Sequence, residues 1–158
     1  MAKKGASTTN ILEAHSRAKV ELLSKYLSIY LRIMQRAEFI KQLHFFDLCA
    51  GEGEYADGGK GSPVKIMQAI RDSYYSDGQK CPEMTVLFND PGLSEVELGQ
   101  RKIDRVRVAV EKVFKPSNVK VTYADKSYRD VLKDVLAIVS PMRSHQRAVV
   151  FIDPHGYK

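Results

Sequence analysis

Four aspartates stand where acidic side chains could bind a polar ligand. Each follows a short run of residues typical of a strand, and they are Asp47, Asp90, Asp125 and Asp153. The carboxyl ends of parallel strands meet at one edge of a sheet, where ligands bind, so we expect the four acids to lie along one rim. A single such aspartate would be explained as the cap of a helix or turn, whereas four in equivalent positions favour a binding site.

The turn after the first predicted strand also contains two glycines. Asp47 precedes Gly51 by four residues, and Gly53 follows two residues later. Glycine lets a backbone approach a ligand where a Cβ atom would collide. A dinucleotide-binding turn has a third glycine that opens a helix at once, and Ala56 stands in that place. A dinucleotide is therefore not the expected ligand.

A phosphate-binding loop does not fit this segment either. Glu54 occupies the position of its first glycine, and Gly61 replaces its Ser or Thr. An acid at the tip of the first strand also repels phosphate, because both groups are negative, and it suits a cation or a hydroxyl donor. S-adenosylmethionine carries a sulfonium cation and ribose hydroxyls, so we expect it as the cofactor. Asp90, after the next strand, is expected to accept both ribose hydroxyls.

A longer pattern extends from this turn toward both ends of the chain. Its members are Asp47, Ala50, Gly51, Gly53, Tyr55, Gly58, Gly61, Ser62 and Pro63, then Phe151, Ile152, Asp153, Pro154, Gly156 and Tyr157, and, near the amino end, His15 and Lys19. The pattern resembles the three-Cys-motif partner family, whose members are similar to class I S-adenosylmethionine-dependent methyltransferases. His155 departs from the pattern, since the resemblance implies an aromatic residue there. Residues 64–147 match only in general pattern, and the resemblance does not settle the methyl acceptor.

The turns and the resemblance together predict which residues bind the cofactor. The set comprises Asp47, Ala50, Gly51, Gly53, Tyr55, Asp90, Asp125, His15 and Lys19. Asp125 is expected at the adenine amine. His15 and Lys19 share one helix face and are expected at the methionine carboxylate, through charge-assisted hydrogen bonds. The alternatives are a packing role for Tyr55 and solvated surface positions for His15 and Lys19.

Catalysis is predicted at the turn after the fourth strand. Amino-methyltransferases place an (Asp/Asn)-Pro-Pro-aromatic turn there, which Asp153, Pro154 and Tyr157 match in part. We expect Asp153 and the Pro154 carbonyl to accept the N–H bonds of an exocyclic nucleobase amine and so to orient its lone pair. Tyr157 is expected to stack on the flipped base. The alternative function is a non-catalytic module that binds the cofactor or docks to a protein partner.

Composition indicates a single soluble domain that comprises residues 1–158 and carries a net charge of +6. Basic residues gather at Arg101, Lys102, Arg105, Arg107 and Lys112. They either contact a nucleic acid or form a solvated helix face, because acids alternate with them. The two cysteines have no spacing typical of a disulfide framework or a metal site. No apolar run reaches the roughly 18 residues of a membrane span, and no secretory signal is present, so we expect a cytoplasmic protein without membrane contact.

Hydrophobic periodicity predicts alternating strands and helices. Strands are expected over residues 43–46, 84–88, 119–123 and 148–152. Helices are expected from a capping box at Asn10 and Glu13 to about residue 38, from Ser62 to about 76, from a capping box at Ser94 and Glu97 to about 114, and from Ser127 to about 140. The alternation predicts an α/β fold with a Rossmann-like open parallel sheet of order 3-2-1-4, flanking helices and an N-terminal helix. The glycine-rich segment 54–61 is expected to act as a lid over the ligand.

The chain stops at Lys158, one turn after the fourth predicted strand. A class I methyltransferase continues through three more strands, so we expect a truncated domain that keeps the cofactor-binding half and is inactive by itself. In the order 3-2-1-4 the fourth strand would be an exposed edge, which invites pairing with another chain. The alternative is a natural short form whose edge is covered by another subunit or a protein partner.

Overall fold

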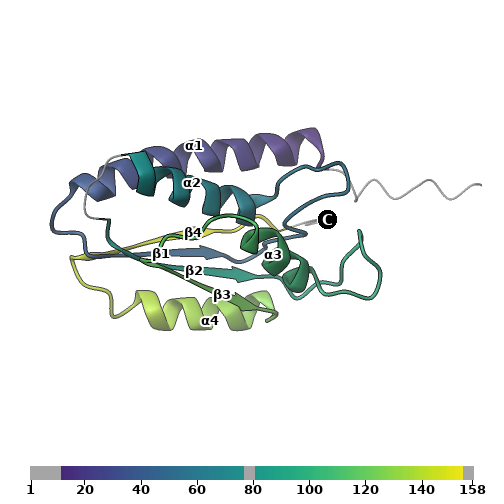
Figure 1. Ribbon diagram of the computed structural model, residues 1–158. Helices are drawn as coiled ribbons and strands as arrows, with labels where there is room; N and C mark the ends of the chain where they lie inside the picture. Colours follow the sequence, from purple (N-terminus) through teal and green to yellow (C-terminus); the bar gives the residue numbers. More distant parts are fainter. Residues whose placement is uncertain (1–11, 77–80, 155–158) are drawn as a thin grey trace, which may run out of the picture.

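Four parallel strands form one sheet in the order β3-β2-β1-β4 (Figure 1). The computed structural model describes residues 12–76 and 81–154. The strands are β1 (Gln42–Asp47), β2 (Glu83–Asn89), β3 (Val119–Ala124) and β4 (Gln146–Phe151). Asp47 at the end of β1 stands opposite Phe88 of β2 and Phe151 of β4. The carboxyl ends of these strands are therefore level, and the turns that follow them meet at one rim.

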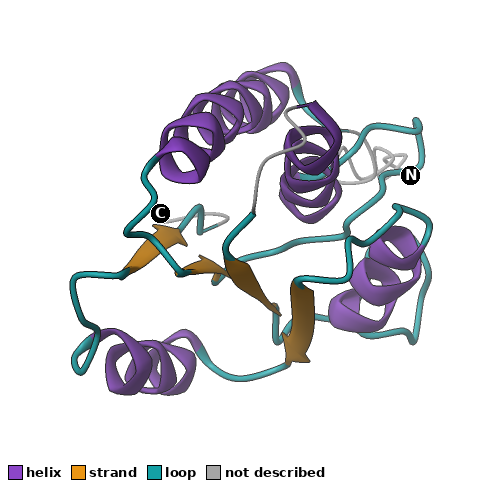
Figure 2. Cartoon of the chain, turned by 60° about the vertical axis from the view of Figure 1, so that its left-hand side comes forward, coloured by secondary structure: helices purple, strands orange, loops and turns teal. Residues whose placement is uncertain are grey.

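Helices cover both faces of the sheet. They are α1 (Ala14–Arg36), α2 (Ser62–Ser76), α3 (Lys102–Glu111) and α4 (Tyr128–Val139). Figure 2 shows α1, α2 and α3 on one face, with α1 toward the β4 side and α3 toward the β3 side, and α4 on the opposite face. The central strand is consequently enclosed by two layers, as in other parallel sheets.

The core has one cluster on each face of the sheet. Leu43 and Phe45 of β1 face the three-helix layer and belong to the larger cluster, which includes Leu27 and Leu31 of α1. Phe46 points to the other face and packs with α4. Because successive side chains of a strand point to opposite faces, this near-continuous apolar run fits a strand buried on both sides. The two layers hold β1 firmly beneath the rim.

The predicted strands, their order and the parallel sheet are confirmed. The predicted start of the fourth helix is also confirmed, since the Ser127 hydroxyl accepts the amide hydrogen of Asp130 at 3.2 Å as an N-terminal cap. α1 begins after Glu13, which makes no side-chain cap, and Asn10 lies outside the described residues.

The predicted helix start at Ser94 is wrong. The Ser94 hydroxyl accepts the amide hydrogen of Glu97 at 2.9 Å, as a helix cap would, but no helix follows. Instead the segment closes on itself, because Ser94 N donates to the Gln100 carbonyl at 2.8 Å and Gly99 adopts a φ of +85°. α3 begins only at Lys102. The closed loop turns the Ser94 hydroxyl inward, toward the rim.

Candidate functional site

Asp90 joins the turns that follow β1 and β2. Gly51 N donates to Asp90 Oδ2 at 2.9 Å, and Gly92 N donates to Oδ1 at 2.8 Å. Gly51 has a φ of +66°, a conformation that glycine adopts without strain. A carboxylate offers about four acceptor sites, so each Asp90 oxygen can still accept a further donor. Asp90 thus orders the glycine turn and keeps capacity for two hydroxyl groups.

Asp47 lies beneath this turn and is fully buried. Its Oδ2 accepts the Ser62 hydroxyl at 2.5 Å, and its Oδ1 accepts Cys49 N at 3.3 Å. Burial raises the pKa of Asp47 to about 7, although these two hydrogen bonds oppose the rise. Asp47 thus ties the glycine turn to the start of α2. Because it is buried beneath the turn, it would act on a bound cofactor through the turn residues that it holds in place.

Gly53, the second glycine of the turn, is required for packing. It has a φ of +74°, and a Cβ atom built there would lie 3.0 Å from the Cα of Val106 in α3. Any side chain at this position would push α3 away from the sheet. Ala50, also predicted at the cofactor, is buried, and its N–H bonds the Asn89 carbonyl at 2.9 Å. Both residues shape the turn from below.

Tyr55 covers the glycine turn. A Cβ atom at Gly51 would lie 3.4 Å from the Tyr55 hydroxyl, which places the phenol directly over the backbone. Burial and, to a smaller extent, the nearby carboxyl groups of Glu52, Asp90, Asp153 and Asp47 together raise the pKa of Tyr55 to about 12. Four carboxyl groups therefore lie close enough to this hydroxyl to act on it electrostatically. Three of them are acids predicted to share the rim.

Glu52 is a buried rim residue that the sequence analysis did not single out. Its carboxylate accepts the Ser94 hydroxyl at 2.9 Å and Glu95 N at 2.8 Å. Arg105 Nε of α3 lies 3.1 Å from the same carboxylate, at ion-pair distance but without hydrogen-bond alignment, and its Nη2 donates to the Glu54 carbonyl at 2.9 Å. This network fixes the 94–100 loop and α3 to the turn. An acid between the two turn glycines, Gly51 and Gly53, is the sequence signal that could have revealed it.

Asn89 is a second residue that the sequence analysis missed. It is fully buried at the end of β2, and its amide nitrogen donates to the carbonyls of Leu48 at 3.2 Å and Lys126 at 3.1 Å. Its side-chain oxygen accepts Lys126 N at 2.9 Å. One amide therefore links the ends of three neighbouring strands. In the sequence, the position of Asn89 directly before Asp90 was the signal that could have indicated this role.

Asp153 and Lys19, predicted for different roles, form one ion pair. Lys19 Nζ donates to Asp153 Oδ1 at 2.8 Å, from α1 to the turn after β4. His15 lies on α1 as predicted, but its ring nitrogen is 3.3 Å from the Glu13 carboxylate and its side chain is largely exposed. Pro154 follows β4 and is exposed, and Tyr157 lies outside the described residues.

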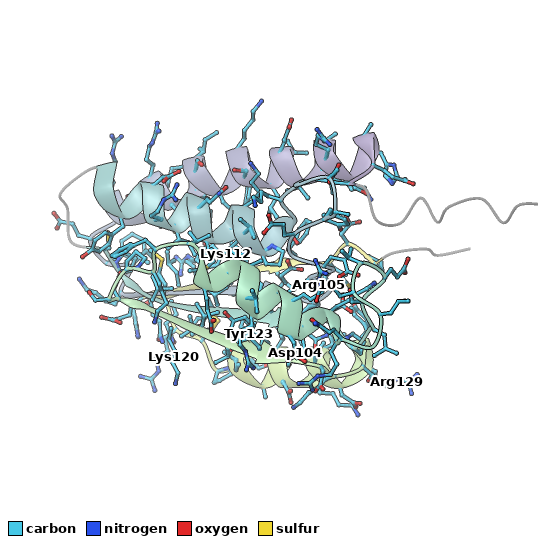
Figure 3. All side chains as sticks on the ribbon, turned by 45° about the vertical axis from the view of Figure 1, so that its right-hand side comes forward. Asp104, Arg105, Lys112, Lys120, Tyr123 and Arg129 are labelled. Atoms are coloured by element: carbon cyan, nitrogen blue, oxygen red, sulfur yellow. The ribbon has the colours of Figure 1, made fainter. Side chains whose placement is uncertain are left out.

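Asp125 forms an ion pair with Arg101, one of the predicted cluster of basic residues, just before the start of α3. Arg101 Nη1 donates to Asp125 Oδ2 at 2.6 Å, and the same guanidinium pairs with Asp104. The Arg107 guanidinium lies 5.0 Å from the centroid of the Tyr123 ring. Figure 3 shows Arg105 and Lys112 on the side of α3, where Lys112, at the C-terminal end of the helix, pairs with Glu54 at 3.2 Å and Arg105 is the half-buried partner of Glu52. Most of the positive charge on this helix is therefore compensated by neighbours.

The predicted lid, residues 54–61, is a short hairpin. Tyr55 N donates to the Gly59 carbonyl at 2.9 Å, and Gly61 N donates to the Gly53 carbonyl at 2.8 Å. Lys60 Nζ lies 2.6 Å from the Glu54 carboxylate across the hairpin. The hairpin holds the Tyr55 side chain over the rim, and closure over a ligand stays a prediction.

The space at the rim is small. The cavity there measures about 20 Å³ and is lined by residues that include Ser16, Gly51, Tyr55 and Asp153. This volume holds about one water molecule, whereas ligand pockets usually measure several hundred Å³. A ligand larger than a water molecule would therefore enter only if side chains that line the cavity, among them Tyr55, moved aside.

Larger cavities lie away from the rim, including one of about 320 Å³ beside Ala14 and Arg17 of α1. One of about 660 Å³ lies at the opposite end of the sheet, between the end of α1 and the start of β2, and includes Gln35 and Glu83. Another of about 420 Å³ lies between the hairpin and α3. None of these cavities gathers the predicted acids. Among residues 12–76 and 81–154, no group of His, Cys, Asp and Glu side chains is arranged to hold a metal ion.

The fold and the site define an open Rossmann-like α/β protein with an acidic rim. The chain matches no family model, no curated protein and no solved structure. The resemblance to the three-Cys-motif partner family therefore stays a prediction that rests on its sequence pattern. In the described part of the chain, no helix is long and apolar enough to cross a membrane.

Proposed function

We propose that the rim binds S-adenosylmethionine and that the protein is a methyltransferase-like member of the Rossmann-like class. The observation that carries this proposal is that Asp90 holds the Gly51 turn, while Tyr55 and Asp153 line the same small cavity beside that turn. Asp90 is held by backbone N–H groups instead of a cation, so its negative charge attracts a cation and repels phosphate groups. It therefore favours a sulfonium nucleoside over NAD or ATP.

Asp90 is the proposed ribose ligand. Its carboxylate is already oriented by Gly51 N and Gly92 N, and its remaining acceptor sites suit two neighbouring hydroxyls. Orientation by backbone N–H groups lowers the cost of ordering the carboxylate when a ligand binds. Asp47 and Asn89 support this arrangement from the buried side of the rim.

Asp153 is the proposed contact for the methyl acceptor. When bound, S-adenosylmethionine supplies an electrophilic methyl group on a positively charged sulfur. Asp153, at the end of β4, can accept an N–H bond of an exocyclic amine and so aim the nitrogen lone pair at that methyl group. The Pro154 carbonyl would accept the second N–H bond. An amine of a nucleobase is the acceptor class that this pair of acceptors fits best.

Calorimetry with four ligands in parallel tests the proposal. S-adenosylmethionine and S-adenosylhomocysteine are expected to bind with saturable heats, whereas NAD and ATP, which carry phosphate groups, are expected to bind far more weakly. Tighter binding of NAD or ATP would contradict the charge argument. Circular dichroism on the same sample verifies that the protein is folded.

A second candidate function, docking to a protein partner, is favoured by an exposed apolar stripe along α1. This stripe consists of Leu22, Tyr26, Ile29 and Ile33, each at least 50% exposed. Residues three or four apart share one helix face, and α1 lies on the side of β4, which pairs only with β1 among the described strands (Figure 2). Lys25, Arg32 and Arg36 flank the stripe, so an acidic polypeptide is the complementary partner. A folded protein that binds none of the four ligands in the calorimetry test would favour this function.

A further inference from the structure

The ion pair between Lys19 and Asp153 bridges two distant parts of the chain at the rim. Its 2.8 Å contact joins α1 to the turn after β4, across 134 residues of sequence. Ser16 and Val20, which flank Lys19 on the same helix, line the small rim cavity together with Asp153. The pair therefore closes the side of the cavity that α1 forms.

Lys19 is less tightly held than Arg105, the other cation that contacts an acid beside the Gly51 turn. The Arg105 side chain is only 12% exposed and is held by Glu52, Glu97 and the Glu54 carbonyl. The Lys19 side chain is 52% exposed and reaches Asp153 through a flexible stem. An ion pair this exposed contributes little stability, so a competing carboxylate can displace it at small cost.

We propose that Lys19 binds the carboxylate of the rim ligand and, by leaving Asp153, frees that acid for the methyl acceptor. This inference rests on the proposed function, because the amino-acid part of S-adenosylmethionine supplies the competing carboxylate. One ammonium group cannot pair fully with both Asp153 and the ligand carboxylate, so the two carboxylates compete for Lys19. Cofactor binding thus frees Asp153, which favours an order of cofactor first and acceptor second. Lys19 is a positioning residue in this scheme and gives the site its preference for a carboxylate-bearing nucleoside.

A comparison of two ligands tests the exchange. Calorimetry is carried out with S-adenosylhomocysteine and with its decarboxylated analogue, S-adenosyl-3-thiopropylamine, which differs only in the carboxylate. Lys19→Met is expected to weaken binding of S-adenosylhomocysteine at least tenfold and to change binding of the analogue less than threefold. Lys25→Met, on the same helix and exposed, is the matched control and is expected to change neither.

Asp153→Asn supplies the test that separates exchange from a merely structural contact. Without its competitor, Lys19 is expected to bind S-adenosylhomocysteine about two- to fivefold more tightly, with no gain for the analogue. The gain is expected to disappear in the Lys19→Met background. Thermal unfolding of each variant verifies the fold.

Three outcomes would overturn the exchange. If Lys19→Met weakens both ligands equally, or neither, Lys19 does not recognise the carboxylate. If Asp153→Asn weakens S-adenosylhomocysteine, Asp153 supports binding instead of competing for Lys19. In these cases the wild-type protein still binds S-adenosylhomocysteine, and the proposed function stands. If the wild-type protein binds neither ligand, the proposed function and the exchange both fail.

Discussion

The four acidic turns look alike in the sequence, but the structure divides them into an inner and an outer pair. The inner pair, Asp47 and Asp90, is hydrogen-bonded to Ser62 and to backbone N–H groups. The outer pair, Asp125 and Asp153, forms ion pairs with Arg101 and Lys19 instead. The same residue type after the same kind of strand therefore has two different sets of partners.

The difference teaches that the available partners, more than residue type, determine what these acids do. Asp47 is buried and Asp90 is half-buried, and hydroxyl or backbone N–H donors hold both, so these two acids order the turns around them. A carboxylate near solvent keeps its hydration and can change partners at small cost. The inner pair is thus suited to hold a site in shape, and the outer pair to respond to what binds there.

The largest effect is expected from the pH dependence of stability at Asp47. Its pKa is about 7 in the folded protein and 3.8 in the unfolded chain, so the folded state keeps a proton that the unfolded state releases between these values. Wild-type stability should therefore fall by about 3 kcal/mol relative to Asp47→Asn as the pH rises from 4 to 7, and should level off above about pH 8. Urea unfolding of both proteins at several pH values measures the difference. Parallel pH profiles would mean that Asp47 is ionised in the folded state.

A smaller effect is expected from Asp90→Ala. The substitution removes a charged acceptor from Gly51 N and Gly92 N, and water can replace it only in part, so the free energy of unfolding should fall by about 2 kcal/mol. Affinity for S-adenosylhomocysteine should fall at least tenfold, because the two ribose hydroxyls lose their acceptor. Asp134→Ala, which removes an exposed acid paired with Lys126, is the control for both measurements. Equal ligand affinity in wild type and Asp90→Ala would rule out the ribose contact.

The smallest effect is expected from Asp125→Ala. Asp125 and its partner Arg101 are both more than half exposed, and Arg101 keeps Asp104 as a second partner. The urea midpoint should stay within the error of the measurement, because exposed ion pairs contribute little. Cofactor affinity should change by less than it does for Asp90→Ala, since Ser127 or the backbone can replace the adenine contact. A loss of stability as large as that of Asp90→Ala would remove the distinction between the inner and outer pairs.

The sequence predicted the sheet and the rim well, because both depend on local patterns. The run around Phe45 predicts a buried strand, and the acid that follows each strand marks its end. The sequence did not predict which acids are buried, because burial of Asp47 depends on contact with Ser62 at the start of α2. The role of Glu52 was missed for a related reason. Its partner Ser94 lies in a segment whose local pattern predicts a helix, although tertiary contacts turn it into a loop.

The pairing of Lys19 with Asp153 was also beyond a local pattern. The two residues are 134 positions apart and meet only because α1 lies on the β4 side of the sheet. Which basic residues pair with Asp125 and Asp153 depends on where the neighbouring helices lie, and the hydrophobic periodicity of the sequence does not determine that placement. The packing role of Gly53 is similar, because the approach of Val106 in α3 explains it better than any ligand does.

The most direct test of the central claim is a titration of the ¹⁵N-labelled protein with S-adenosylhomocysteine, followed by amide NMR spectra. If the rim is the binding site, the amides of Gly51, Tyr55 and Gly92 should shift and saturate together, since the first and third donate to Asp90 and Tyr55 must move. The amide of Glu83, beside the 660 Å³ cavity at the opposite end of the sheet, should stay in place. Saturable shifts around Glu83 with none at the rim, or no shifts at all, would contradict the account.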